Sequence, residues 1–293
     1  MIYNNENAAL LATGLPLEEI ASLLRERLSG EALQDKLNSM GNKYLKRYLI
    51  IKEYKDLVIS GKQKLPIIIV LTGMPGVGKT SLSREIATML GVGPVLGGDA
   101  IRSACRGLLP RKRNKPFFTS VYQSWQFFGK YTEKNAIRGY RAQAKILNDT
   151  MQRIIVDRGL RDGESMIIEF LHFIPDQFSQ EVFNHPSFIP FVLKINDADI
   201  YTQRLQARER YTHLRSSGDR LIQQQGKYLL LQSYQCSCAE KAGIPIIVMD
   251  DFEKGFEDML NHLFPRIKKL NQLLDYSNNL SIIQRLTKER EDV

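Results

Sequence analysis

The chain has 293 residues, of which 43% are hydrophobic and 25% are charged, and its formal net charge is +9. This composition is typical of a soluble globular protein with a substantial core. No apolar run approaches membrane-spanning length and the N-terminus lacks a signal-peptide pattern, so we expect neither contact with a membrane nor secretion. The three cysteines are too few for a disulfide framework and suit reduced thiols, so we expect a cytoplasmic protein. The positive charge favours polyanionic partners, from nucleotides and phosphorylated metabolites to nucleic acid, without choosing among them.

Residues 1–62 are expected to form a helical N-terminal region. Pro16 in a first-turn position, with apolar residues at helical spacing behind it, predicts an amphipathic helix that ends at Gly30. A shorter helix to Met40 and a longer one over 43–60 follow. These helices either cover the main domain or form a small module of their own.

Residues 63–264 are expected to form the main domain, in which short apolar strands alternate with helices. This alternation predicts an α/β fold, with a parallel sheet flanked by helices on both faces. The strands are expected at 66–71, 94–96, 165–169, 190–195 and 244–249, and the helices at 81–90, 119–128, 135–160, 197–209, 219–242 and 252–263.

The first strand leads into a loop that fits the G-x-x-x-x-G-K-[ST] pattern of phosphate-binding loops, and a helix follows the loop. Its glycines allow the backbone N–H groups to point at an anion, at the positive end of the helix dipole. Lys79 is expected to reach the β- and γ-phosphates of a nucleotide, and Thr80 to hold Mg²⁺. The predicted nucleotide-binding residues are Gly73, Met74, Pro75, Gly76, Val77, Gly78, Lys79, Thr80 and Ser81.

Asp99 follows the second strand, and ligands of an open parallel sheet bind beyond the carboxyl ends of its strands. A phosphoryl acceptor needs a carboxylate near the γ-phosphate. We therefore predict that Asp99 is the base or orienting group for an acceptor hydroxyl and that it contributes to the Mg²⁺ site. The alternative is that Asp99 only caps the helix that follows.

A basic run over 106–115 is followed by aromatic residues over 117–128. Basic residues interleaved with aromatic ones bind single-stranded nucleic acid by charge and stacking. However, Tyr122, Trp125 and Phe128 also stand at helical spacing, which favours a place in the core. The basic residues would equally suit a small phosphorylated acid.

Glu169 ends the third strand and is the candidate for a second carboxylate, which would contact Mg²⁺ directly or through water. The alternative is that Glu169 is a structural residue at the strand end, with its hydrogen bonds already satisfied. His172 follows it as a candidate for substrate binding, although a lone histidine behind a buried strand is more often a structural group.

Arg204 and Arg208 are four residues apart and share a helix face after the fourth strand. With Arg210 and Arg215 they precede Ser216-Ser217-Gly218, so we predict a lid whose arginines cover the transferring phosphates. The alternative is a solvated basic face. The remaining residues, 265–293, are interpreted as a helical tail for packing or for a partner.

The order of these motifs resembles the 2-phosphoglycerate kinase family of P-loop kinases. The resemblance covers roughly residues 44–250, and Arg204, Arg208 and Arg215 fall where that family has its lid arginines. Residues 65–80 look like its phosphate loop, 98–106 like its T-D-S-I-R…R segment, 119–123 like its S-S-Y stretch, 139–143 like its G-F-x-x-Q and 167–175 like its I-E-G-V-H-x-x-P.

The family transfers the γ-phosphoryl group of ATP to 2-phosphoglycerate. The resemblance implies the same reaction class, with Lys79 and Thr80 on ATP·Mg²⁺ and with Asp99 and Glu169 at the reacting centre. It also implies an acceptor site. The residues expected there are Arg102, Arg106, Tyr122 and His172, and the residues expected in catalysis are Lys79, Asp99, Glu169, Arg204 and Arg208.

Three departures from the family pattern concern the acceptor and regulation. Phe170-Leu171 replace the Gly-Val of the family and are expected to add bulk beside the acceptor, and 225–229 lacks an arginine that the family carries there. Many members also have a regulatory ATP-binding cone at the N-terminus. Residues 10–60 resemble only the later helices of such a cone.

We therefore expect an ATP- and Mg²⁺-dependent P-loop kinase that acts on a hydroxyl of a small phosphorylated or carboxylated metabolite, with 2-phosphoglycerate as the leading candidate. One alternative is a polynucleotide 5′-hydroxyl kinase, suggested by the net charge and by residues 106–128. The other is a non-enzymatic, nucleotide-gated binding protein, suggested by the helices at the two ends of the chain. The oligomeric state is not predicted.

Overall fold

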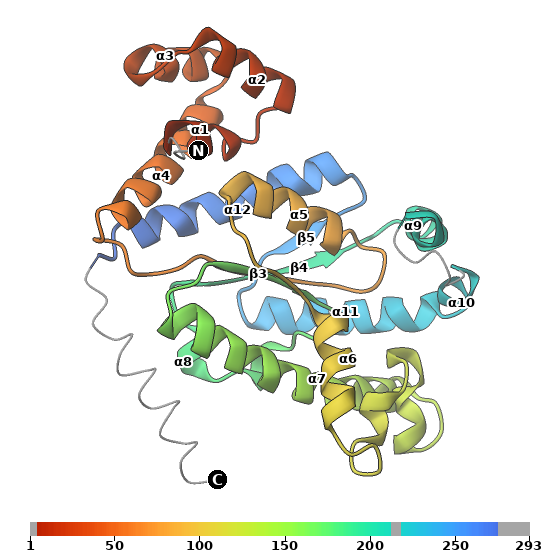
Figure 1. Ribbon diagram of the computed structural model, residues 1–293. Coiled ribbons are helices and arrows are strands. Elements are labelled where there is room, and N and C mark those ends of the chain that lie inside the picture. The colour runs from red at the N-terminus through yellow and green to blue at the C-terminus, as the bar shows by residue number, and fades with distance from the viewer. Residues whose placement is uncertain (1–4, 212–217, 275–293) are drawn as a thin grey trace.

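The computed structural model describes residues 5–211 and 218–274 and has a parallel sheet at its centre (Figure 1). The sheet order is β2-β3-β1-β4-β5, and every pairing is parallel, which confirms the predicted fold class. The strands are β1 Ile68–Thr72, β2 Val95–Gly97, β3 Met166–Phe170, β4 Phe188–Lys194 and β5 Ile246–Val248.

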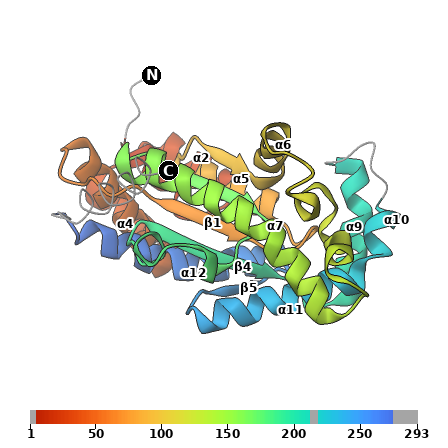
Figure 2. The same ribbon diagram turned by 90° about the horizontal axis from the view of Figure 1, so that it is seen from below.

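Helices cover both faces of this sheet. Figures 1 and 2 show α5 and α12 on one face and α7 and α11 on the other. The α-helices are α1 Asn5–Leu11, α2 Leu17–Glu26, α3 Gly30–Met40, α4 Asn42–Ile59, α5 Lys79–Leu90, α6 Gly98–Leu108, α7 Glu133–Ile154, α8 Gln180–Phe183, α9 Ala198–Tyr211, α10 Asp219–Ile222, α11 Gln225–Lys241 and α12 Phe252–Asn271. Short 3₁₀ segments are η1 Lys115–Phe118, η2 Val121–Phe128 and η4 Pro175–Gln177, and the segment η3, Ile155–Arg161, is a π-helix.

Strand β1 is buried on both sides, which explains its continuous apolar sequence. Ile69 and Leu71 belong to one apolar cluster, and Ile68 and Val70 belong to a second cluster on the other side. The first cluster also includes apolar residues of α1, α2 and α3. The N-terminal helices therefore share a core with one face of the sheet. Within the described residues, no helix is both long enough and apolar enough to cross a membrane.

Several helices differ from the prediction. The helix expected over 219–242 is divided into α10 and α11, and the one expected over 135–160 continues from α7 into the π-helix η3. The helix after Pro16 ends at Glu26, because Arg27 takes a left-handed conformation, and Gly30 instead begins α3. The helix predicted over 252–263 continues through Pro265 to Asn271. An interior proline costs a helix about 3 kcal/mol, and the burial of the apolar face of α12 on both sides of Pro265 offsets this cost. Of the predicted tail, residues 275–293 lie outside the described residues.

The helical segment expected over 119–128 is present as the 3₁₀ segment η2, and a second 3₁₀ segment, η1, precedes it. Val121 and Ser124 are buried three residues apart, which matches a turn of three residues. The backbone of Ser124 lies against Gly139 of α7, where a Cβ atom would come within 2.5 Å of the Ser124 carbonyl carbon. This close approach fixes the segment against α7.

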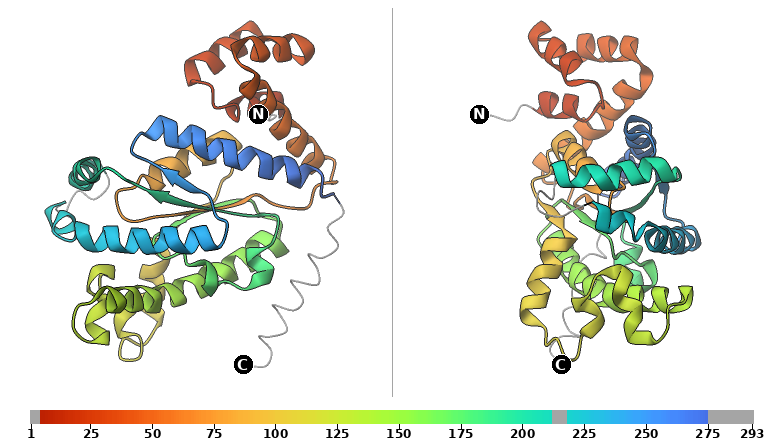
Figure 3. Two further views of the ribbon diagram at one scale, coloured as in Figure 1. Left: turned by 180° about the vertical axis from the view of Figure 1, so that it is seen from behind. Right: turned by 90° about the vertical axis from the view of Figure 1, so that its right-hand side faces the viewer.

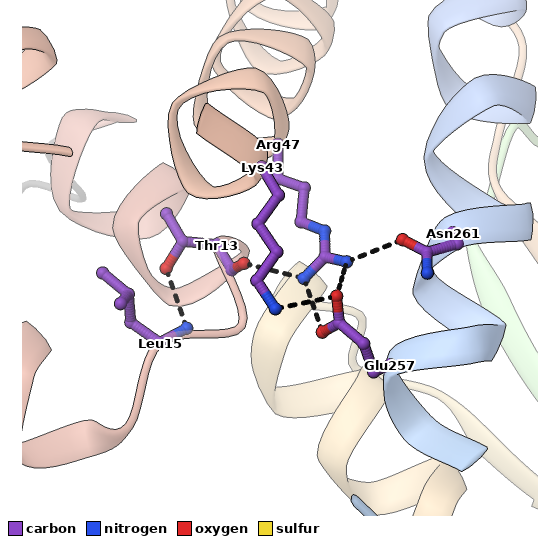
Figure 4. Close-up of polar contacts among 6 residues, drawn as sticks. All are labelled: Thr13, Leu15, Lys43, Arg47, Glu257 and Asn261. Carbon is purple, nitrogen blue, oxygen red and sulfur yellow. Dashed lines mark hydrogen bonds and ion pairs between the residues drawn. The ribbon is translucent and has the colours of Figure 1, made fainter. Parts of the chain in front are cut away.

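A buried arginine ties the N-terminal helices to α12 (Figure 4). Arg47 on α4 is only 3% exposed. Its guanidinium donates to both carboxylate oxygens of Glu257 at 3.1 and 2.7 Å, to Oδ1 of Asn261 at 3.1 Å and to the carbonyl of Thr13 at 3.3 Å. Lys43 binds the same carboxylate at 2.9 Å from an exposed position. One acidic group therefore has a buried and an exposed cation as partners.

Replacing Arg47 with Met is expected to lower the free energy of unfolding by roughly 3 kcal/mol, at the low end for a broken buried ion pair. The low end applies because the Glu257 side chain is 35% exposed and stays partly solvated. Lys43→Met removes the exposed partner of the same carboxylate and is expected to cost no more than about 1 kcal/mol. Urea denaturation of the two variants measures the difference, and equal losses would contradict the assignment.

Acidification gives a second measure of this ion pair. Partial burial would raise the pKa of Glu257, but the hydrogen bonds from Arg47 and Lys43 outweigh it and lower that pKa. A carboxylate with a lowered folded-state pKa stabilises the protein above its unfolded pKa, and the contribution is lost as the pH falls through the folded-state value. The difference in the free energy of unfolding between the wild type and Arg47→Met should therefore be largest above about pH 4.3 and decrease below it.

Candidate active site

The loop between β1 and α5 is shaped to enclose an anion. Gly73, Gly76 and Gly78 have φ values of +153°, +86° and +96°, a region that other residues rarely adopt. A Cβ atom at Gly73 would come within 2.5 Å of the Leu193 carbonyl oxygen of β4. Only glycine therefore lets the loop lie this close to the end of the neighbouring strand. The α5 helix begins at Lys79, so its first N–H groups lie at the loop.

Lys79 and Thr80, at the end of the loop and the start of α5, both form hydrogen bonds with neighbouring groups. Lys79 Nζ donates to the carbonyls of Gly73 and Met74 at 2.8 and 3.0 Å, across the loop. Thr80 Oγ1 donates to Oε1 of Glu169 at 3.1 Å. The other carboxylate oxygen of Glu169 is buried and has no hydrogen-bond partner among the described residues. A buried carboxylate oxygen without a partner is costly, so a cation or a donor is expected to bind there.

The register of the sheet explains how Glu169 reaches Thr80, although the two are far apart in the sequence. Glu169 pairs with Leu71 on one side, just before the loop, and with Gly97 on the other, just before Asp99. The three strands therefore place the loop, Glu169 and the start of α6 at one edge of the sheet. The right panel of Figure 3 faces this end of the molecule, with α9 above and α6 below.

Phe170 does not add bulk to an acceptor pocket, so the expectation for Phe170-Leu171 was wrong for Phe170. For Leu171, which is partly exposed, it stays a prediction. The Phe170 side chain is 3% exposed and belongs to the second apolar cluster, with its ring centroid 6.1 Å from that of Phe173. Gly98 makes room for it, because a Cβ atom at Gly98 would lie 2.1 Å from the Phe170 Cβ. Alternation along β3 explains the result, since neighbours of Glu169 point to the opposite face.

Asp99 lies exposed in the first turn of α6, and the N-cap position is Gly97, with no capping side-chain hydrogen bond. The alternative in which Asp99 is the N-cap is therefore wrong. The negative charge of Asp99 acts on both Arg102 and Arg106, which lie one and two turns further along α6. The structure thus brings together the carboxylate and the two arginines that the resemblance grouped.

Arg102 and Arg106 both hold the loop between η1 and η2. Arg106 donates to the carbonyls of Phe117 and Thr119 at 2.9 and 3.1 Å, and Arg102 donates to the same two carbonyls. Among the described residues, neither guanidinium forms an ion pair with a carboxylate. Burial, followed by the charge of Arg106, lowers the pKa of Arg102 to about 10, so Arg102 remains charged at neutral pH. Burial also lowers the pKa of Arg106, and the charge of Asp99 opposes this. Two neighbouring cations that donate their hydrogen bonds to neutral carbonyls, and that also lie over the rings of Phe117 and Phe118, would be stabilised by an anion.

His172 lies inside the protein and is 2% exposed. Its Nε2 is 3.1 Å from Oε1 of Gln143, and its ring stacks on that of Tyr140 with the centroids 5.8 Å apart. Burial, then the charges of Arg102 and Lys79, lower the pKa of His172 well below its ordinary value. The ring is therefore neutral at neutral pH and lies behind the site rather than at its surface.

Tyr122 also lies in the interior. It is 7% exposed, belongs to the first apolar cluster and packs edge-to-face against Tyr228 at 5.9 Å. Of the two interpretations of the aromatic segment, the core is the one that fits Tyr122. The basic residues before it approach its aromatic rings, with Arg111 Cζ lying 6.0 Å from the centroid of Phe118.

Arg204 on α9 reaches the phosphate loop. Its Nη2 donates to the carbonyl of Asp250 at 3.1 Å, and its Nη1 is 3.8 Å from the position of a Cβ atom at Gly78. Burial lowers the pKa of Arg204, although the charges of Asp250 and Asp251 oppose this. The side chains of Arg208 and Arg210, and all of Arg215, lie outside the described residues. The predicted lid therefore stays a prediction.

The residues present fit a magnesium ion that is coordinated partly by the protein and partly by the phosphates of a nucleotide. Among the described residues, no group of three or more His, Cys, Asp or Glu side chains could hold a metal by itself. Mg²⁺ in phosphate-loop proteins needs no such cage, because it takes one or two protein ligands together with phosphate oxygens and water. Thr80 and the buried, unpartnered oxygen of Glu169 lie at the start of α5 and would supply such ligands.

The sequence analysis did not predict two buried glutamines behind the site as individual site residues. The amide nitrogen of Gln143 donates to the carbonyls of Pro116 and Thr119 at 2.6 and 3.1 Å, and Gln235 binds at the ends of β1 and β3. Only the G-F-x-x-Q resemblance pointed to Gln143. Polar residues on a helix usually indicate its solvated face, so no pattern pointed to Gln235.

Comparisons with known proteins agree with this geometry. The family described as "AAA domain" matches residues 69–223. The mevalonate-3-phosphate 5-kinase of Thermoplasma acidophilum is 36% identical over 194 residues, which cover 66% of this chain and 94% of that protein. The 2-phosphoglycerate kinase of Methanopyrus kandleri is 24% identical over 265 residues, which cover 86% of this chain and 79% of that protein. The 2-phosphoglycerate kinase of Methanocaldococcus jannaschii is 26% identical over 238 residues, which cover 77% of this chain and 74% of that protein.

The chain belongs to the P-loop kinases of the 2-phosphoglycerate kinase type. This P-loop kinase is a phosphotransferase with a nucleotide-binding loop, which decides against the non-enzymatic binding protein. The named relatives act on small phosphorylated metabolites, and none of these names supports a nucleic acid as the acceptor.

Proposed function

We propose that this P-loop kinase transfers the γ-phosphoryl group of ATP, in the presence of Mg²⁺, to a hydroxyl of a small acid that carries a phosphate. The observation that supports the acceptor class is the pair Arg102 and Arg106, which carry two charges with no carboxylate ion pair among the described residues. The pair lies on the helix that opens with Asp99, next to the edge where the loop and Glu169 meet.

The reaction needs positioning and charge stabilisation more than covalent work by the protein. The acceptor oxygen forms a bond to the γ-phosphorus as the bond to the bridging oxygen breaks, ADP leaves, and the hydroxyl proton passes to the carboxylate of Asp99. Lys79 and Arg204 would stabilise the charge on the transferring group. Bound Mg²⁺ would be held by Thr80 with Asp99 or Glu169, directly or through water, and would neutralise phosphate charge.

Two acceptors fit this class. 2-Phosphoglycerate is a carboxylic acid with a phosphate and a free hydroxyl, and it is the leading candidate from the sequence. Mevalonate 3-phosphate has the same three groups, and the Thermoplasma acidophilum relative, named as the kinase for it, is the more similar of the two kinds. Because the Phe170 side chain lies in the core, it does not exclude either acceptor by its size.

An ATP-coupled assay with both acids, 3-phosphoglycerate and a 5′-hydroxyl oligonucleotide tests the proposal. We expect acceptor-dependent ADP release with at least one of the two phosphorylated acids and none with the oligonucleotide. Release with the oligonucleotide alone would favour the polynucleotide kinase. If no member of a wider metabolite panel releases ADP, the proposed acceptor class is wrong.

The acceptor site gives a separate prediction. Arg106→Gln is expected to raise the KM for the phosphorylated acceptor by roughly 10- to 100-fold, as for the loss of one charged hydrogen bond of about 1.5–3 kcal/mol. The KM for ATP should change by less than about threefold, since ATP binds at the loop. Arg111→Gln, which removes an exposed cation from the same region, is the matched control. Equal effects of the two variants would indicate general attraction by positive charge.

A further inference from the structure

Buried side chains of α7 and α11 meet at the two strand ends that carry the phosphate loop and Glu169. The amide nitrogen of Gln235 lies 3.1 Å from Oγ1 of Thr72, 2.7 Å from the hydroxyl of Tyr140 and 2.7 Å from the carbonyl oxygen of Leu171. The Tyr140 hydroxyl donates to the same carbonyl at 2.8 Å. Thr72 is the last residue of β1 and Leu171 follows the end of β3.

Two of the residues that contact Gln235 are close in the sequence to residues of the candidate active site. Thr72 directly precedes Gly73, the first glycine of the loop, and Leu171 comes two residues after Glu169. One side-chain amide therefore joins the start of the loop to the strand that carries the carboxylate. From the other side, Thr80 donates to Glu169, which closes a connection between the same two segments.

This junction is enclosed by protein. Gln235 is 2% exposed and Tyr140 is fully buried, and burial raises the pKa of the Tyr140 hydroxyl, which stays protonated. Hydrogen bonds in such a setting are strong and directional, and the loss of one partner leaves the others unsatisfied. The distance between the two strand ends is therefore fixed by specific contacts as well as by the sheet.

We propose that Gln235 is a positioning residue for phosphoryl transfer, which holds Glu169 in register with the phosphate loop. The inference rests on the proposed function, because Gln235 acts through Glu169 and touches no reacting atom. Transfer is sensitive to such placement, since a displacement of about 1 Å can cost roughly 100-fold in rate.

Gln235→Met tests the proposal, because it keeps the length and volume of the side chain and removes its amide. We expect kcat to fall roughly 10-fold or more, and the KM for ATP to change by less than about threefold. Tyr140→Phe keeps Gln235 and removes one hydroxyl, so it should lower kcat in the same direction by less. It serves as the second variant if Gln235→Met folds poorly.

Gln232 offers a matched control on the same helix. It is 8% exposed, and its amide binds the backbone of Ile195 beyond the end of β4, with distances of 3.1 and 2.8 Å. Gln232→Met should lower the melting temperature by a similar amount and leave kcat within about threefold of the wild type. Equal losses of kcat in the two variants would overturn the proposal, because they would reflect a general loss of structure.

A double-mutant cycle with Glu169→Gln identifies the route of the effect. If Gln235 acts through Glu169, Gln235→Met should change kcat by less than about threefold in the Glu169→Gln background. The same fold loss in both backgrounds would overturn the proposal. Acceptor-independent ATP hydrolysis is measured in parallel. Absence of transfer by the wild type would then count against the proposed acceptor, while the cycle on hydrolysis still decides the role of Gln235.

Discussion

Replacing Asp99 with Asn is expected to lower kcat for phosphoryl transfer by roughly 10²- to 10⁴-fold, the usual contribution of a positioned general base. The amide keeps the shape of the side chain but cannot accept the hydroxyl proton. Because Asp99 lies in the first turn of α6, outside the loop that encloses the phosphates, ATP binding should weaken by less than about tenfold even if Asp99 contributes to the Mg²⁺ site. Steady-state kinetics and calorimetric titration with ATP·Mg²⁺ measure the two effects.

Asp251→Asn is the matched control for this substitution. Asp251 also follows a strand and begins a helix, but its carboxylate accepts from the N–H of Lys254 at 2.8 Å as an N-cap. Asn caps helices nearly as well as Asp, so this variant should retain its activity and its stability. Full activity of Asp99→Asn would exclude Asp99 as the base and leave Glu169 as the candidate carboxylate.

Replacing Lys79 with Met is expected to reduce transfer by roughly 10³-fold or more. Lys79 supplies a cation at the phosphates, and removing one such stabilising donor costs roughly 10²- to 10³-fold even without a loss of binding. ATP binding should weaken as well, because the same charge attracts the phosphates before the reaction. The transfer assay and titration with ATP·Mg²⁺ measure these changes.

Lys79→Arg separates charge from geometry. The ammonium group of Lys79 reaches two carbonyls of its own loop, at Gly73 and Met74, and a planar guanidinium cannot take the same compact position. We therefore expect Lys79→Arg to recover part of the ATP binding and little of the transfer. Recovery of most of the transfer would mean that positive charge alone is sufficient at this position.

The sequence was sufficient for the sheet and the loop, because both depend on local patterns. The apolar run before Gly73 predicted β1, and the spacing of the glycines predicted the turn around the phosphates. The contact of Thr80 with Glu169 joins residues that are distant in the chain. Predicting it requires the order of the strands in the sheet. Polar residues at strand ends indicate which edge of the sheet carries the site, but they do not indicate which strands are neighbours.

The parts that could not be predicted depend on tertiary contacts of polar groups. Tyr122 could be assigned to the core or to a ligand surface from its spacing, and only packing against Tyr228 decides between them. Gln235 is polar on a helix, which in a sequence indicates solvent, and its three partners come from three different segments. Such residues are recognised only once the fold has brought their partners together.

Because the N-terminal helices and the sheet share one apolar cluster, we expect their unfolding to be coupled to the occupancy of the loop. Leu10 of α1 and Leu82 of α5 belong to the same cluster, and α5 begins at Lys79. A ligand that binds only the folded protein stabilises every segment that unfolds with the loop, by an amount set by its concentration relative to its Kd. Nucleotide should therefore slow proteolysis within α1 to α4, far from the phosphates, and removal of these helices would expose an apolar side of α5 to water.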